Sequence, residues 1–190
     1  MREAKPAAWL AVVALVAVCA GGCGGSSTKT TSGKTTADAY VSQVCSSIGE
    51  WLRSVENSSA EIGGQLNPGS TPAHAKAALE TLMRTSVEDS ERVVAGLHAA
   101  GTPDVADGDQ ISTALVGSFE QATTALRRVE EQVKRLPTND PSAFLAASRQ
   151  VSSSVQSSLA PIGSGLSSLR SSELQQAAAR TQACKNLGAG

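Results

Sequence analysis

Four cysteines offer the most specific chemistry among the residue types of this 190-residue chain. Cys19 and Cys23 follow an apolar stretch near the N-terminus, whereas Cys45 and Cys184 lie near the two ends of the remaining sequence. A cysteine thiol can be acylated, oxidised to a disulfide or used as a reactive nucleophile. A redox-active role for Cys45 and Cys184 fits poorly, because the chain has no Cys-x-x-Cys spacing.

Residues 1–22 have the layout of a secretory signal peptide. Arg2 and Lys5 make the start of the chain positive, and residues 7–18 form an uninterrupted apolar run. A membrane-spanning helix needs about 20 apolar residues, so this run is too short to span a bilayer. Small residues at positions 20–22 precede Cys23, and small residues are typical of a signal cleavage site.

The segment Ala20-Gly21-Gly22-Cys23 resembles the lipobox of bacterial lipoprotein precursors. In that family a diacylglycerol is attached to the cysteine, and a peptidase cuts the chain immediately before it. The resemblance covers the leader alone, has Ala20 where leucine is usual, and implies that Cys23 is lipidated. Cys19 fits less well because bulky Val18 would lie at the cut. An ordinary secretory signal that releases a soluble protein is the alternative.

The leader therefore predicts a cell-envelope protein, lipid-anchored to the cell membrane on its extracytoplasmic side. Two acyl chains hold a protein firmly, since each buried methylene contributes about 0.8 kcal/mol. Residues 23–37 are mostly Gly, Ser and Thr, so we expect a lipidated, flexible tether. Residues 38–190 are then long enough to form one domain with a core. The layout as a whole resembles small helical actinobacterial lipoproteins, whose molecular roles are mostly unknown.

Apolar residues recur at helical spacing in four segments of this domain, and no strand pattern of useful length is present. The short connections between the segments favour an all-α fold: an antiparallel up-down-up-down four-helix bundle. A fresh helix start at Ser171 predicts a further short C-terminal helix. Four expected helix starts have N-cap residues, which are Asp38, Thr71, Asp107 (with Gln110 in a capping box) and Asp140. The clearest apolar stripe is Ile111, Leu115, Phe119, Ala122, Leu126, Val129, Val133 and Leu136.

The fourth segment is rich in serine and glycine, which are poor helix formers. Pro161 is expected to kink or split this helix. Small side chains between Val151 and Leu169 have two interpretations. They leave a cavity inside the bundle, or they let two helices approach closely.

The expected bundle also brings two cysteines together. In an antiparallel four-helix bundle the start of the first helix lies beside the end of the fourth, which places Cys45 near Cys184. Outside the cytoplasm such a thiol pair oxidises, so a disulfide is predicted. A straight helix from Pro141 to Cys184 would overshoot Cys45 at the usual helical rise. The chain must therefore bend or reverse between Pro161 and Ser172.

The remaining polar residues do not indicate an enzyme. His74 and His98 lie about 36 Å apart along one expected helix, so they cannot share a metal ion. The spacing of the aspartates at 104, 107 and 109 does not match a calcium-binding EF-hand loop. Glu88, Asp89 and Glu91 are expected to form a solvated acidic patch. We therefore predict no catalytic residue, no cofactor and no metal site.

The charge balance excludes one further class of partner. Without residues 1–22 the chain keeps about 14 basic and 16 acidic side chains, so it lacks the basic surface of a nucleic-acid-binding protein. We expect a non-enzymatic interaction module that binds an envelope protein or polymer. The alternative is a carrier or sensor of an apolar small molecule or lipid held within the bundle.

Overall fold

A computed structural model describes residues 33–65, 69–167 and 171–187 of the chain. Within these ranges the protein is all-α apart from two very short strands, as the sequence predicts. Cys23 and the rest of residues 1–32 lie outside the described residues, so the leader and most of the tether stay predictions.

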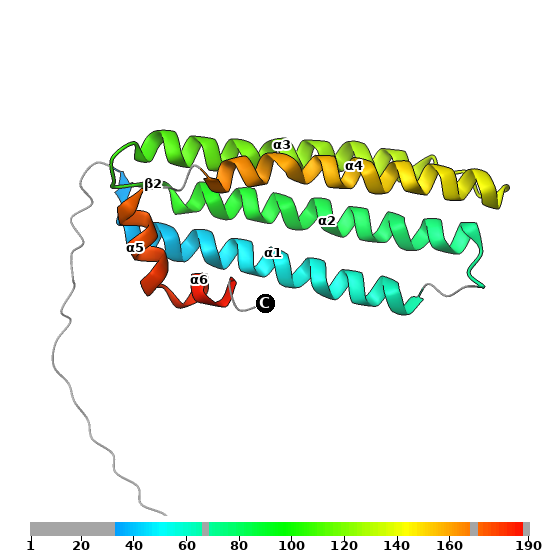
Figure 1. Ribbon diagram of the computed structural model, residues 1–190, viewed down its shortest axis with the longest axis horizontal. Coiled ribbons are helices and arrows are strands. Elements are labelled where there is room, and N and C mark those ends of the chain that lie inside the picture. Colours follow the sequence, from blue (N-terminus) through cyan, green and yellow to red (C-terminus); the bar gives the residue numbers. More distant parts are fainter. Residues whose placement is uncertain (1–32, 66–68, 168–170, 188–190) are drawn as a thin grey trace, which may run out of the picture.

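Four long helices build the domain, and two short ones follow them (Figure 1). Successive long helices run in opposite directions. The long helices are α1 (Ala37–Gln65), α2 (Pro72–Ala100), α3 (Gly108–Lys134) and α4 (Pro141–Ser167), and the short ones are α5 (Ser172–Arg180) and α6 (Gln182–Leu187).

Two short strands join the start of the described chain to the α2–α3 connection. Strand β1 (Lys34–Thr35) pairs in parallel with β2 (Thr102–Pro103). The last residues of the expected tether therefore lie within the folded domain rather than ahead of it.

The long helices pack in sequence order, α1 on α2, α2 on α3 and α3 on α4. Helices α1 and α4 are not among the packed pairs, and α5 and α6 pack against α1 instead. Figure 1 shows α6 alongside the first half of α1. The all-α class is confirmed, whereas the closed four-helix arrangement expected from the sequence is not confirmed.

The core consists of two apolar clusters along the length of the helices. The cluster nearer β1 contains Tyr40, Phe119 and Leu174, and the other contains Met83 and Phe144. Burial raises the pKa of Tyr40 to about 12, so its hydroxyl stays protonated at neutral pH.

All eight positions of the apolar stripe predicted for the third helix are buried. Each buried Val, Leu, Ile or Phe side chain of this stripe contributes roughly 1.5–3 kcal/mol.

Two of the four predicted helix caps are confirmed. The Thr71 hydroxyl accepts a hydrogen bond from the His74 backbone N–H at 3.2 Å. Asp140 Oδ1 accepts hydrogen bonds from the backbone N–H groups of Ser142 at 2.8 Å and Ala143 at 3.2 Å. In both cases proline occupies the first helical position, where a missing N–H costs nothing.

Of the other two predicted caps, Asp38 is wrong, and Asp107 holds the N-cap position of α3 without making the capping hydrogen bond. At α1 the cap is Thr36, whose hydroxyl accepts from the Ala39 backbone N–H at 3.3 Å. Asp38 instead forms an exposed ion pair with Arg180 at 2.8 Å. At α3, Asp107 has a left-handed backbone with φ of 59° and makes no capping hydrogen bond. A capping side chain needs an extended backbone at its own position, so the expected capping box with Gln110 does not form.

The charged outer face of α3 carries ion pairs near its end. Lys134 Nζ lies 3.0 Å from Glu130, four positions earlier, and 2.7 Å from Glu131. The hydrogen bond and charge of Lys134 lower the pKa of Glu131. Such exposed pairs add little stability.

Helix α4 continues through Pro161 and is not split there. It ends at Ser167, and the next helix begins at Ser172, which lies in the interval where a bend was expected.

A Cβ atom at Gly165 would come within 2.3 Å of Ser118 Oγ and 2.6 Å of Ser118 Cβ on α3. The glycine therefore lets α4 and α3 approach closely, which is the packing interpretation of the small residues.

This close approach gives opposite expectations for two glycines on α4. Gly165→Ala should destabilise the fold by about 1–3 kcal/mol, because the added methyl overpacks the contact with Ser118. Gly163→Ala is the matched control: nothing lies within 4 Å of its Cβ position, so alanine should stabilise the helix by about 0.5–1 kcal/mol. Urea unfolding of both variants measures the difference, and equal effects of the two substitutions would contradict the close contact.

Candidate functional site

Cys45 on α1 and Cys184 on α6 are joined as a disulfide, with their Cα atoms 5.1 Å apart. The predicted pair is therefore within bonding distance, but the geometric reason differs from the one expected. Helix α6 brings Cys184 to α1, whereas the sequence argument used the end of the fourth long helix. The chain reverses after α4: α5 crosses the end of the domain, and α6 then runs along α1 (Figure 1).

The disulfide holds a helix that packing alone holds weakly. Helix α6 has six residues, and none of its side chains is fully buried. Isolated helices of that length are unstable in water. The sulfur bridge spans 139 positions of sequence, and the chain-entropy model for such a loop gives about 5 kcal/mol as an upper figure.

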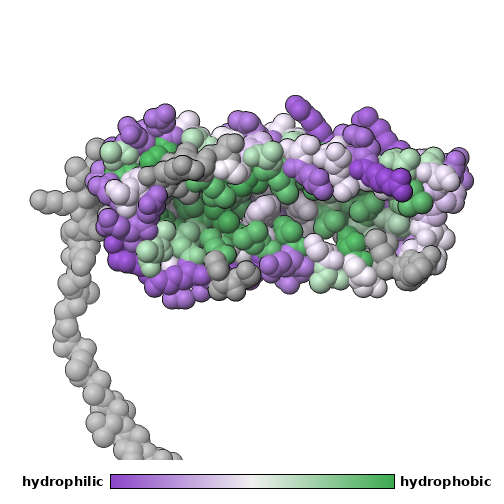
Figure 2. All heavy atoms as spheres, viewed as in Figure 1, coloured by the Kyte–Doolittle hydropathy of each residue, from purple (hydrophilic) through white to green (hydrophobic). Residues whose placement is uncertain are grey.

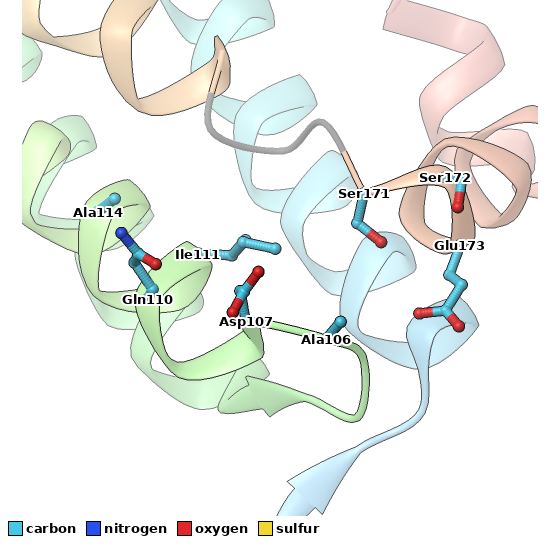
Figure 3. A pocket seen from close by; sticks show the side chains of 8 residues that line it. All are labelled: Ala106, Asp107, Gln110, Ile111, Ala114, Ser171, Ser172 and Glu173. Carbon is cyan, nitrogen blue, oxygen red and sulfur yellow. The ribbon is translucent and has the colours of Figure 1, made fainter.

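A hollow of about 550 Å³ lies at the end of the domain that carries β1 and α5 (Figure 3). Its α3 side includes Asp107, Gln110 and Ile111, and its α5 side includes Ser171 and Glu173. These residues come from two helix starts that are more than 60 positions apart in the chain. No sequence pattern connects them, because only the reversal after α4 places the start of α5 opposite the start of α3.

The hollow has a mixed polar and apolar lining, with carboxylates on both walls. Asp107 and Glu173 supply acceptors, and Gln110, Ser171 and Ser172 supply donors as well. Ile111 and two alanines add an apolar surface. Such a set suits a ligand with hydroxyl or ammonium groups rather than an anion. Among the described residues no three metal-binding side chains gather, here or elsewhere.

A second polar feature lies between α1 and α2, where Asp89 is only 3% exposed. Its carboxylate accepts hydrogen bonds from the Ser54 hydroxyl and the Arg92 guanidinium. The expectation of a solvated acidic patch at residues 88–91 is therefore wrong for Asp89, while Glu88 and Glu91 are exposed. One signal was present in the sequence: Asp89 lies four positions before Val93 and so falls on the apolar side of α2.

Trp51 closes the inner side of this seam. Its ring meets Phe119 of α3 edge to face, with centroids 6.2 Å apart. The Trp51 Nε1 atom is buried and has no hydrogen-bond partner in the described part of the chain. The seam around Trp51 and Asp89 encloses about 260 Å³.

The histidines and the remaining aspartates lie apart from one another. His74 is in the first turn of α2, and His98 in the last turn lies 3.3 Å from Glu120 of α3. Asp104 and Asp109 are exposed near the start of α3. The structure does not bring any of these four residues into one cluster.

Comparisons of the chain with protein-family models, with curated proteins and with solved structures each find no match. Among the described helices, none combines the length and the apolar character that crossing a bilayer requires.

Reducing the disulfide should cost the protein much of its stability. We expect the free energy of unfolding of the oxidised protein to fall by about 2–5 kcal/mol when a thiol reductant is added. The Cys45→Ala/Cys184→Ala double variant should match the reduced protein and should not respond to reductant. Denaturant unfolding with and without reductant measures both effects, and an oxidised protein whose stability ignores reductant would contradict the assignment.

Proposed function

We propose that this chain is a lipid-anchored protein of the cell envelope, held on the outer face of the membrane, that works by binding and not by catalysis. The observation that carries the proposal is the lipobox-like segment ending at Cys23. It lies ten positions before Gly33, where the described domain begins. Ten residues reach at most about 35 Å, so the domain would stay close to the membrane surface.

The place where the described chain begins supports an orientation for the anchored domain. Strand β1 lies at the end of the domain that also carries α5 (Figure 1). The hollow between α3 and α5 is at the same end. An anchor attached through β1 would therefore place the hollow on the membrane-proximal side.

The arrangement of the long helices belongs to this proposal. Alternating helix direction and short connections favour an antiparallel up-down-up-down bundle as the scaffold. The carboxylates of Asp107 and Glu173 in the hollow favour a hydroxyl- or ammonium-bearing partner, such as an envelope polymer or a protein surface. Nucleic acid remains excluded as a partner by the near-neutral charge of the domain.

Carriage of an apolar molecule inside the bundle is the less favoured function. The hollows described above are lined by residues of the α2–α3 connection and of α1, α2, α3 and α5. On α4, by contrast, Val151, Ser158 and Ile162 are buried, and Gly165 approaches Ser118. The small residues of α4 are thus used for packing, which favours the interaction module over the carrier.

Replacing the anchoring cysteine tests the location. Cys23→Ala should move the protein from the membrane fraction to the soluble fraction and remove the mass of the lipid, because no acyl chain can then be attached. Cys19→Ala is the matched control and should leave the protein membrane-bound. Membrane fractionation with intact-mass measurement reads both results, and equal membrane retention of the two variants would contradict the anchor.

The hollow is tested by crosslinking in native membranes. A photo-crosslinking residue in place of Gln110 should capture an envelope component, since this position lines the hollow. The same residue in place of Gln121, which is exposed elsewhere on α3, is the control and should capture much less. Equal capture at the two positions would contradict recognition through the hollow.

A further inference from the structure

Three large hydrophobic side chains are exposed in the described part of the chain, and all three lie on α1 and α4. Leu52 of α1 is 37% exposed, and Leu145 and Leu166 of α4 are 57% and 39% exposed. The long helices pack in the order α1, α2, α3, α4, and α1 and α4 are not a packed pair. Figure 2 shows apolar residues gathered in a band along the face of the domain that Figure 1 turns toward the viewer.

The charges of the two helices are complementary. Arg149 is the one charged side chain in the sequence of α4, and the exposed residues beside it include Ala146, Ser153 and Ala160. Such small side chains let a second helix approach closely. Helix α1 carries four acidic residues and one basic residue, namely Asp38, Glu50, Glu56, Glu61 and Arg53.

We propose that a second copy of this chain covers this face, with α4 of each copy packed against α1 of the other. A two-fold symmetric contact uses the same patch on both copies, so one chain must contain both complementary surfaces. The weakly basic, small-residue surface of α4 and the acidic surface of α1 meet that requirement. Packing α1 against its own copy would instead bring like charges together.

A two-fold axis along the length of the helices suits this contact. It creates two equivalent α1–α4 contacts and leaves β1 of both copies at the same end of the dimer. The choice of an axis that puts both β1 strands at one end rests on the proposed anchor, because two anchored chains must enter the same membrane. The dimer itself does not depend on lipidation.

Sedimentation of the complete chain in density-matched detergent tests the proposal. We expect a dimer, and we expect Leu52→Asp and Leu145→Asp each to weaken dimerisation at least tenfold. Gln121→Asp, at an exposed position on α3, is the matched control and should leave the dimer intact. Both leucines are exposed, and circular dichroism should show that the variants keep the fold.

Mixing the two leucine variants distinguishes the α1–α4 contact from other dimers. A Leu52→Asp copy paired with a Leu145→Asp copy places both changes in one contact and leaves the other contact unaltered. The mixture should therefore dimerise more strongly than either variant alone. A monomer at all concentrations, a dimer insensitive to both substitutions, or a mixture no stronger than its components would overturn the proposal.

Discussion

The covalent link between Cys45 and Cys184 is the constraint on which the rest of the domain depends. Helices α1 to α4 are held by apolar contacts between neighbours in sequence order. Helix α6 has less apolar support, because it is short and none of its side chains is fully buried, although Leu187 packs against the core. Fixing Cys184 to α1 keeps α6 in place, and with it α5, whose Leu174 and Ala177 complete the core at that end. The disulfide thus decides which residues close the first apolar cluster.

That closure also creates the candidate site. The hollow exists because the start of α5 lies opposite the start of α3. Its carboxylates come from Asp107 and Glu173, which share no motif in the sequence. A domain whose end is fixed in this way presents a recess at the end where the described chain begins, which is the side of the proposed tether. This arrangement is consistent with a protein that binds a partner close to the membrane.

The sequence predicts the helices well and their arrangement less well. The apolar stripe of α3 identifies its buried side at every position, because a helix that packs on both neighbours needs an unbroken stripe. The caps at Thr71 and Asp140 follow from local chemistry with proline as a second signal. Asp38 and Asp107 have no proline as a second signal. Asp38 lies inside α1, and Asp107 has a left-handed backbone, so neither side chain makes a capping hydrogen bond. The burial of Asp89 depends on Ser54 in another helix, which local patterns do not reveal. The partner of Cys45 was predicted, but the path of the chain to it was not, because it depends on a reversal in which α5 crosses the end of the domain and α6 returns along α1.

The central claim is that the chain is exported and that oxidation then locks its two ends together. Peptide mapping of the protein extracted from membranes, without reduction and with free thiols alkylated, measures this directly. The account predicts a peptide pair linked through Cys45 and Cys184, together with an N-terminal peptide that begins at Cys23 and carries lipid. Alkylated Cys45 and Cys184 in the exported protein would contradict it.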